Sequence, residues 1–224
     1  MELASGLHAF IWDTPNVNNC NSYLLRSAEK TILVDPGHAA YFDHVRRGLE
    51  RIDLTPENID LVICTHAHPD HMEAARLLTG RASPPLLALH AAEWALVQSM
   101  APYLKATMGV ALEDFEPDFF LDEGPLQVGD LALIVHHTPG HSPGGVTLYW
   151  PEHKALIVGD LVFNGGLGRT DLPGGDGNQL KQSIRRMSEM DAEWLLSGHG
   201  QVLSGAAAIK TNFQQVEQTW FNYI

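Results

Sequence analysis

The sequence predicts a layered α/β fold, in which short buried strands alternate with amphipathic helices. Two features of the pattern support this prediction. Short apolar runs rich in branched residues recur along the chain, and stretches with apolar residues at three- and four-residue spacing lie between them. With 224 residues, of which 45 % are hydrophobic, the chain is long enough to bury a sizeable core. We therefore expect a single domain that spans residues 1–224.

The first half of the chain is expected to begin with strands and to continue with alternating strands and helices. The expected strands are residues 8–13, 22–26, 31–35, 59–64 and 86–90. A helix over residues 41–52 would bury one face that carries Phe42, Val45 and Leu49. A second helix is expected over residues 70–78.

The second half repeats this theme. Strands are expected over residues 131–137, 146–150, 155–158 and 194–197, and helices over residues 179–190 and 205–221. The segment between the halves, residues 91–125, is a candidate substrate wall, although we favour a helical pair over residues 91–108 that covers the sheet. Its polar candidates for substrate binding are Tyr103 and Lys105.

A glycine-rich loop over residues 164–177 is the second candidate wall. It carries Arg169, whose planar guanidinium suits an anionic substrate. An internal ion pair of Arg169 with Asp171 or Asp176 is the alternative.

Composition limits the partners. The formal net charge is −13 and there is no basic run, which argues against nucleic acid and anionic membranes and leaves a small-molecule substrate. No apolar run is long enough to span a membrane, and the N-terminus does not resemble a signal peptide. With only Cys20 and Cys64 as cysteines, we expect a cytoplasmic protein. The sequence leaves its oligomeric state open.

The segment Thr-His-Ala-His-Pro-Asp-His, residues 65–71, follows a strand that we expect to be buried on both faces. Imidazoles and carboxylates are ligands for Zn²⁺ and similar divalent ions. Residues two apart in an extended segment project to the same side, so His66 and His68 can share one metal. Asp70 and His71 open the next helix and would hold a neighbouring metal. Cys64, inside the strand, is expected to be a small buried hydrophobe rather than a reactive thiol.

Three further candidate ligands also follow predicted strands. His141 lies in a Pro- and Gly-rich loop after residues 131–137, Asp160 follows residues 155–158, and His199 follows residues 194–197. Each histidine alone could be an ordinary turn residue, but together with the first cluster they indicate a metal site at one rim of the sheet. Asp35, at another strand end, is expected to be a structural carboxylate that caps the loop near the cluster.

This ordered set of His66, His68, Asp70 and His71, then His141, Asp160 and His199, resembles the metallo-β-lactamase-fold hydrolases. The residues Gly-Asp-Leu-Val-Phe at 159–163 and Gly-Arg-Thr-Asp-Leu-Pro at 168–173 are similar to the branch that contains the glyoxalase II-like thioester hydrolases and the persulfide dioxygenases. The resemblance implies an αββα sandwich of two mixed β-sheets flanked by helices.

The resemblance also implies roles for the ligands. His66, His68 and His141 would hold one metal, Asp70, His71 and His199 the other, and Asp160 would bridge the two. The expected cofactors are two divalent ions, with Zn as the first choice and Fe or Mn as alternatives. A hydroxide between the ions would attack a thioester or related acyl ester, and Asp70 would also orient the hydroxide or accept its proton.

Several alternatives remain at this stage. A persulfide dioxygenase of the same branch would use a single iron on His66, His141 and Asp160, and a lactonase would share the fold. The non-enzyme alternative is a metal-binding interaction module that keeps the fold without catalytic activity. Only one predicted helix follows His199, so a separate glutathione-binding domain is not expected.

Overall fold

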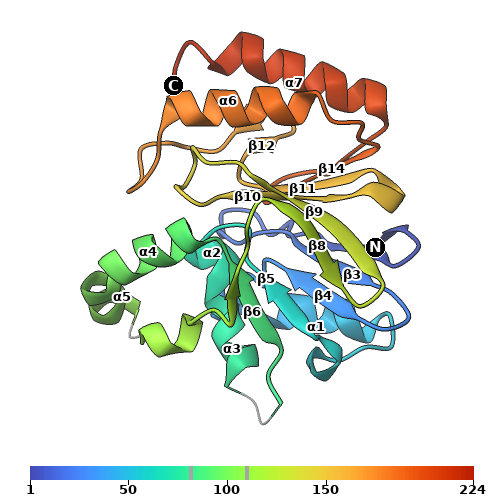
Figure 1. Ribbon diagram of the computed structural model, residues 1–224, viewed down its shortest axis with the longest axis vertical. Coiled ribbons are helices and arrows are strands. Elements are labelled where there is room, and N and C mark those ends of the chain that lie inside the picture. Colours follow the sequence, from blue (N-terminus) through green and yellow to red (C-terminus); the bar gives the residue numbers. More distant parts are fainter. Residues whose placement is uncertain (81–82, 109–110) are drawn as a thin grey trace. The chain divides into compact units, whose positions relative to one another are not determined.

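The computed structural model describes residues 1–80, 83–108 and 111–224, without the side chains of Tyr103, Thr107 and Met108. The chain forms two compact units. Unit 1 contains Met1–Leu121 and Val128–Leu131, and unit 2 contains Asp122–Gln127 and Ala132–Ile224. Each unit has one mixed sheet of its own with helices beside it (Figure 1). The single domain expected over residues 1–224 stays a prediction.

Unit 1 contains a seven-stranded sheet with the order β1-β2-β3-β4-β5-β6-β7. The strands from β1 to β4 pair antiparallel, and those from β4 to β7 pair parallel. The strands are β1 (Glu2–Ala4), β2 (Leu7–Phe10), β3 (Ser22–Arg26), β4 (Thr31–Val34), β5 (Leu61–Ile63), β6 (Leu86–Leu89) and β7 (Phe119–Phe120). The α-helices are α1 (Asp43–Glu50), α2 (Pro69–Met72), α3 (Arg76–Thr79), α4 (Ala91–Ser99) and α5 (Ala101–Met108).

The core of unit 1 forms because its central strands are apolar on both faces. Every residue of β4 and β5 is buried, as expected for parallel strands covered on both sides. Helix α1 packs Val45 and Leu49 against this core, and its Gly48 lies close to Phe10. A Cβ atom at Gly48 would come within 2.5 Å of the Phe10 ring, so the close approach of helix and strand requires glycine there.

The helix expected over residues 70–78 is wrong as one continuous element. The structure has α2, a 3₁₀ turn over Glu73–Ala75, and α3 instead. The Ala74 N–H donates to the Gly37 carbonyl at 2.8 Å, and it is therefore diverted from the carbonyl of Asp70, its partner in a regular helix. A tertiary hydrogen bond thus interrupts a segment whose local pattern is helical.

The helical pair expected over residues 91–108 is confirmed by α4 and α5. Val97 is buried, and Trp94, Leu104 and Leu112 pack against the core of unit 1. These apolar side chains therefore act mainly in packing.

Unit 2 contains a six-stranded sheet with the order β15-β14-β11-β10-β9-β8 and a separate β12–β13 hairpin. The strands are β8 (Gly124–Val128), β9 (Leu131–His137), β10 (Val146–Trp150), β11 (Ala155–Gly159), β12 (Val162–Phe163), β13 (Gly166–Leu167), β14 (Trp194–Ser197) and β15 (Leu203–Ser204). Helices α6 (Gly177–Ser188) and α7 (Ala206–Trp220) lie beside one another, orange and red in Figure 1. They share one apolar cluster with β11, to which α6 contributes Leu180 and Ile184 and α7 contributes Ile209 and Phe213.

Strands β9, β10 and β14 have the bounds that their sequences predict, whereas β8 was not predicted. Strand β8 contains Pro125 and lies at the edge of its sheet, where a residue without an N–H is tolerated. Among the described residues, no helix is long and apolar enough to cross a membrane.

Candidate metal-binding residues

In unit 1 the candidate ligands follow β5 directly. Because β4, β5 and β6 are parallel, the residues after all three strands leave the same edge of the sheet. Asp35 follows β4, the segment Thr65–His71 follows β5, and His90 and Glu93 follow β6. The topology therefore gathers polar groups from three parts of the sequence around the histidine cluster.

Asp35 is the central acceptor of this edge. It is 1 % exposed, its Oδ1 accepts the Thr65 backbone N–H at 2.7 Å, and its Oδ2 lies 2.7 Å from the Thr65 hydroxyl and 2.9 Å from His71 Nδ1. Its backbone is left-handed, with φ 53°, a conformation that aspartate tolerates better than most residues. The structural carboxylate expected at Asp35 is confirmed.

These hydrogen bonds fix which ring nitrogens of the histidines carry the proton. A carboxylate only accepts, so His71 donates from Nδ1 to Asp35 and presents Nε2 as its lone-pair nitrogen. The Thr65 hydroxyl gives its hydrogen to Asp35 and accepts from His66 Nδ1 at 3.2 Å. One buried carboxylate thus sets the tautomer of His66 and of His71, the arrangement in which proteins hold metal-ligating histidines.

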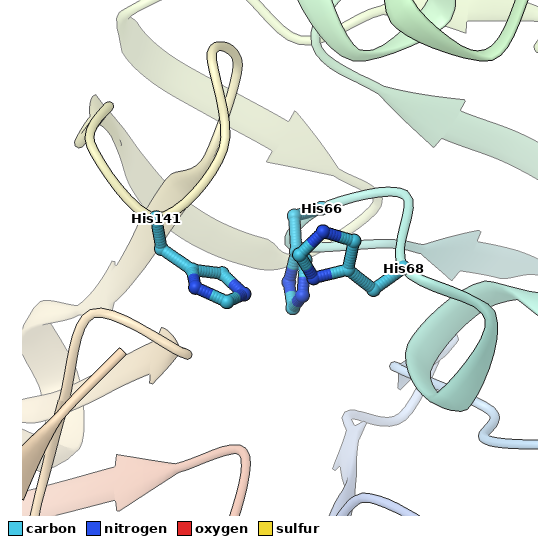
Figure 2. Close-up of side chains that lie close together, drawn as sticks. All are labelled: His66, His68 and His141. Carbon is cyan, nitrogen blue, oxygen red and sulfur yellow. The ribbon is translucent and has the colours of Figure 1, made fainter. Parts of the chain in front are cut away.

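The other two candidate ligands of unit 1, His68 and Asp70, lie beside these histidines. The rings of His66 and His68 meet edge to face, with centroids 4.7 Å apart (Figure 2). A ligand atom of His66 lies within 4.8 Å of one of His68, and the same limit holds for Asp70 and His71. The side-chain amide of Asn18 donates to Asp70 Oδ2 at 2.9 Å, which holds that carboxylate in place.

The turn between His66 and His68 is anchored from α4. Glu93 is fully buried, and its Oε2 accepts the Ala67 backbone N–H at 2.9 Å. Its charge and that of Asp35 act on Cys64, which is also fully buried. Burial first, and then the charges of Asp35 and Glu93, raise the pKa of the Cys64 thiol well above its usual value. The expected small buried hydrophobe is confirmed at this position.

In unit 2 three strand ends bring three candidate ligands together. His141 lies in the loop after β9 (Figure 2), Asp160 follows β11, and His199 lies two residues beyond β14. Asp160 Oδ2 is 3.5 Å from His141 Nε2 and 3.3 Å from His199 Nε2. His141 and Asp160 are nearly buried, whereas His199 keeps 29 % of its side chain exposed.

Backbone groups hold the His141 loop. The Arg169 carbonyl lies 2.7 Å from His141 Nδ1, so that nitrogen donates. The Ser183 hydroxyl donates to the Pro139 carbonyl at 2.7 Å, and the Asp176 N–H donates to the Gly140 carbonyl at the same distance. Helix α6 and the residue before it therefore fix the loop.

Glycine at position 168 allows two candidate ligands, Asp160 and His141, to lie close to the same point of the main chain. A Cβ atom there would lie 1.9 Å from the Asp160 carbonyl oxygen and 2.9 Å from His141 Nδ1. No side chain larger than hydrogen fits without moving the backbone of Asp160.

The donor groups fit divalent metal ions. Because His141 donates from Nδ1 to a backbone carbonyl, Nε2 is the nitrogen that faces the Asp160 carboxylate oxygen. When that nitrogen carries no proton, its lone pair and the carboxylate oxygen together favour a cation between them. Imidazole nitrogens combined with carboxylates are the ligand set of Zn²⁺, Fe²⁺ and Mn²⁺.

The three candidates for substrate binding lie in different surroundings. Arg169 is exposed and forms a two-bond ion pair with Asp171, with both N···O distances at 2.6 Å. This guanidinium lowers the pKa of the Asp171 carboxyl to about 2. Lys105 is exposed on α5, and the side chain of Tyr103 lies outside the described residues. Binding of substrate by these three residues stays a prediction.

Three features of the site were not predicted from the sequence. Asn18 and Glu93 support Asp70 and the histidine turn, and the loop from Trp12 to Asn21 lies beside the ligands. The signal for the loop was available, because an aromatic residue stands alone in a run of Asp, Thr, Pro and Asn residues. For Glu93 there was no such signal, because nothing in the helical pattern of residues 91–99 sets a buried glutamate apart from an exposed one.

Comparison with known proteins gives consistent results. The family model described as the metallo-beta-lactamase superfamily matches residues 15–199. A probable metallo-hydrolase of Methanocaldococcus jannaschii is 32 % identical over 186 residues, which are 81 % of this chain and 88 % of the relative. Hydroxyacylglutathione hydrolase GloC of Haemophilus influenzae is 30 % identical over 186 residues, 81 % of this chain and 85 % of the relative.

A similar solved structure comes from a protein in a di-iron-bound form. It is 30 % identical, has a TM-score of 0.69, and the match covers 89 % of this chain and 92 % of the other. This likeness agrees with the predicted fold class, since both units of the present chain are mixed sheets flanked by helices.

Proposed function

Because the chain belongs to the metallo-β-lactamase superfamily, as residues 15–199 show, we propose that it is a metal-dependent hydrolase that cleaves thioesters. The products would be a carboxylic acid and a thiol. The observation that carries the proposal is that three histidines have their Nδ1 atoms in hydrogen bonds, which directs their Nε2 atoms to bind metal. The Nδ1 partners are Asp35 for His71, Thr65 for His66 and the Arg169 carbonyl for His141. The 30 % identity to a hydroxyacylglutathione hydrolase supports the thioester as the bond cleaved.

In this proposal the seven ligands serve one dinuclear centre. His66, His68 and His141 would hold one ion, Asp70, His71 and His199 would hold the other, and Asp160 would be a ligand of both. The di-iron form of a protein that is 30 % identical supports two ions. When bound, divalent ions polarise a carbonyl and lower the pKa of water from 15.7 to about 7.

The residues of the chain supply the rest of the chemistry. The Asn18 amide donates to Oδ2 of Asp70 and holds this carboxylate in place, and Asp70 would bind metal and accept the proton of the attacking water. Asp35 keeps the Nδ1 proton on His71 directly and on His66 through Thr65, which leaves the Nε2 nitrogen of each ring to bind a metal ion. The buried Cys64, with its raised thiol pKa, takes no part as a nucleophile.

The experiment combines metal analysis with turnover. We expect about two divalent ions per chain in the purified protein, and hydrolysis of a panel of acyl thioesters that stops on chelation and returns with Zn, Fe or Mn. Asp70→Asn should lower kcat by at least about 100-fold, in the range found for general acid–base groups. Asp43→Asn, an exposed aspartate of α1, is the matched control.

Two outcomes would overturn this function. A single iron together with sulfite formation from a persulfide would identify a dioxygenase. Full metal loading without hydrolysis of any thioester, lactone or phosphoester would identify a metal-binding module that does not catalyse hydrolysis.

A further inference from the structure

Unit 1 carries an aromatic pair that the proposed chemistry does not use. The rings of Trp12 and Tyr41 lie with centroids 5.1 Å apart and planes inclined by 35°. His44 meets the Trp12 ring edge-on at 5.3 Å, and His38 meets the Tyr41 ring edge-on at 6.0 Å. We call Trp12 and Tyr41 the aromatic wall.

A first short series of hydrogen bonds connects the aromatic wall to the candidate metal ligands of unit 1. The Trp12 indole N–H donates to the Val17 carbonyl at 2.9 Å, which folds the ring over its own loop. The next residue, Asn18, donates its side-chain amide to Asp70 Oδ2 at 2.9 Å. The loop that holds the Trp12 ring is therefore the loop that holds Asp70.

A second series of hydrogen bonds starts from His71. Its carbonyl accepts the Gly37 N–H at 3.1 Å, and the short 3₁₀ helix Ala39–Tyr41 begins two residues after Gly37. The His38 N–H donates to Asn19 Oδ1 at 2.7 Å, which ties this turn to the Trp12 loop. Both members of the aromatic wall are thus positioned relative to Asp70 and His71 by hydrogen bonds.

The aromatic wall leaves part of its surface open to contact. Tyr41 keeps 37 % of its surface exposed, and Trp12 is half-buried. The indole N–H is already bonded to Val17 and the Trp12 backbone N–H to Asn21 Oδ1 at 2.9 Å, so what Trp12 offers to solvent is mainly an apolar ring. Rigid aromatic side chains give large contact areas at low entropic cost.

We propose that the aromatic wall binds a planar aromatic group of the substrate. This inference rests on the proposed thioester hydrolysis and assigns Trp12 and Tyr41 to substrate selection. The aromatic group can belong to the acyl part or to the thiol part of the thioester, and the test separates the two.

The test compares three thioesters under identical metal loading. They are the acetyl thioester of N-acetylcysteamine, the phenylacetyl thioester of N-acetylcysteamine, and the acetyl thioester of phenylmethanethiol. We expect the wild-type protein to prefer one of the two phenyl compounds. Trp12→Leu and Tyr41→Leu should each lower kcat/KM for that compound about tenfold, the effect of losing an aromatic contact. The acetyl N-acetylcysteamine thioester should change less than about twofold.

Tyr149→Leu is the control, because Tyr149 is a half-buried aromatic residue of unit 2 whose hydroxyl bonds the Asp191 carbonyl. It should leave the preference among the three compounds unchanged. An equal loss on all three compounds in Trp12→Leu and Tyr41→Leu would overturn the proposal, because it would mean that these residues only position Asp70. An unchanged preference in both variants would overturn it as well.

A binding measurement separates this proposal from the proposed function. Saturation-transfer NMR of phenylacetate and of phenylmethanethiol with the Asp70→Asn protein needs no turnover. If wild-type protein hydrolyses no thioester, the proposed function has failed. Phenyl signals that appear with Asp70→Asn and vanish when Tyr41→Leu is added would still support the aromatic wall, and signals absent from Asp70→Asn would overturn it.

Discussion

The two units hold their candidate ligands in different ways. In unit 1 four candidate ligands lie within six residues, and the buried carboxylate of Asp35 contacts His71 directly and His66 through Thr65. In unit 2 three ligands come from three strand ends, and a backbone carbonyl and a glycine hold two of them. The unit 1 group depends on one charged side chain, whereas the unit 2 group depends on the course of the main chain.

This difference teaches where each group is sensitive to mutation. A side chain that fixes tautomers can be tested by removing its charge while the backbone stays intact. A group held by close backbone approach is tested by adding a methyl group. Cys64 should matter to neither group.

The largest effect is expected for Asp160→Asn in unit 2. This change removes the negative charge that lies 3.3–3.5 Å from two imidazole nitrogens. We expect the affinity for metal to fall by more than about 100-fold, because residues that only support a ligand already contribute about 10- to 100-fold, and activity to fall with it. Competition with a chromophoric chelator measures the affinity. Unchanged metal content and turnover would contradict the bridging role.

The second-largest effect is expected for Asp35→Asn in unit 1. This change keeps a residue that tolerates φ 53°, but it replaces a carboxylate oxygen, which accepts hydrogen bonds, with an amide nitrogen, which donates them. The amide nitrogen would face His71 or Thr65, so we expect a loss of about 1–3 kcal/mol in unfolding free energy of the metal-free protein. Metal affinity should fall about 10- to 100-fold.

Urea unfolding measures the stability change in this variant, and chelator competition measures the affinity. Asp43→Asn serves here too as the exposed aspartate control. If both quantities stay at wild-type values, the histidine tautomers do not depend on Asp35.

A smaller effect on metal affinity is expected for Gly168→Ala. The added methyl would lie 1.9 Å from the Asp160 carbonyl oxygen, so the backbone must move at a cost of about 1–3 kcal/mol. Thermal unfolding and metal stoichiometry should both report the change. Gly166→Ala is the matched control, since its Cβ would be 3.6 Å from the nearest Phe163 atom. Equal behaviour of the two variants would show that the approach at Gly168 is not tight.

The smallest effect on turnover is expected for Cys64→Ser. The thiol is fully buried and its pKa is raised by burial, so it supplies no nucleophile. Turnover per bound metal should stay within about twofold, although a buried hydroxyl costs about 1–3 kcal/mol of stability. Cys20→Ser, at the other buried cysteine, is the control. A fully loaded but inactive Cys64→Ser protein would show that the thiol takes part in the reaction.

The sequence was sufficient to predict the fold class and the strand ends after which the candidate ligands lie. His141 and His199 lie after β9 and β14, whose bounds follow from their apolar runs. An apolar run is a local property of the sequence, whereas the sheet topology decides at which edge of the sheet the residues after that run lie. The family to which the chain belongs also agrees with the resemblance read from the ordered ligands.

The supporting contacts could not be predicted because they join residues far apart in the sequence. Glu93 reaches Ala67 across 26 positions, and Asn18 reaches Asp70 across 52. The break in the helix at Ala74 likewise depends on the distant carbonyl of Gly37. Local patterns carry no information on such pairs, and they favoured a regular helix where a tertiary bond prevents one.

The left-handed backbone of Asp35 has a consequence for the variation that this position can accept. Glycine would adopt φ 53° easily but would bring no carboxylate, while glutamate would bring the carboxylate at the cost of a strained backbone. Asparagine meets the conformational requirement and fails the chemical one. A library of all amino acids at position 35, selected for metal-dependent activity, should therefore return aspartate almost alone.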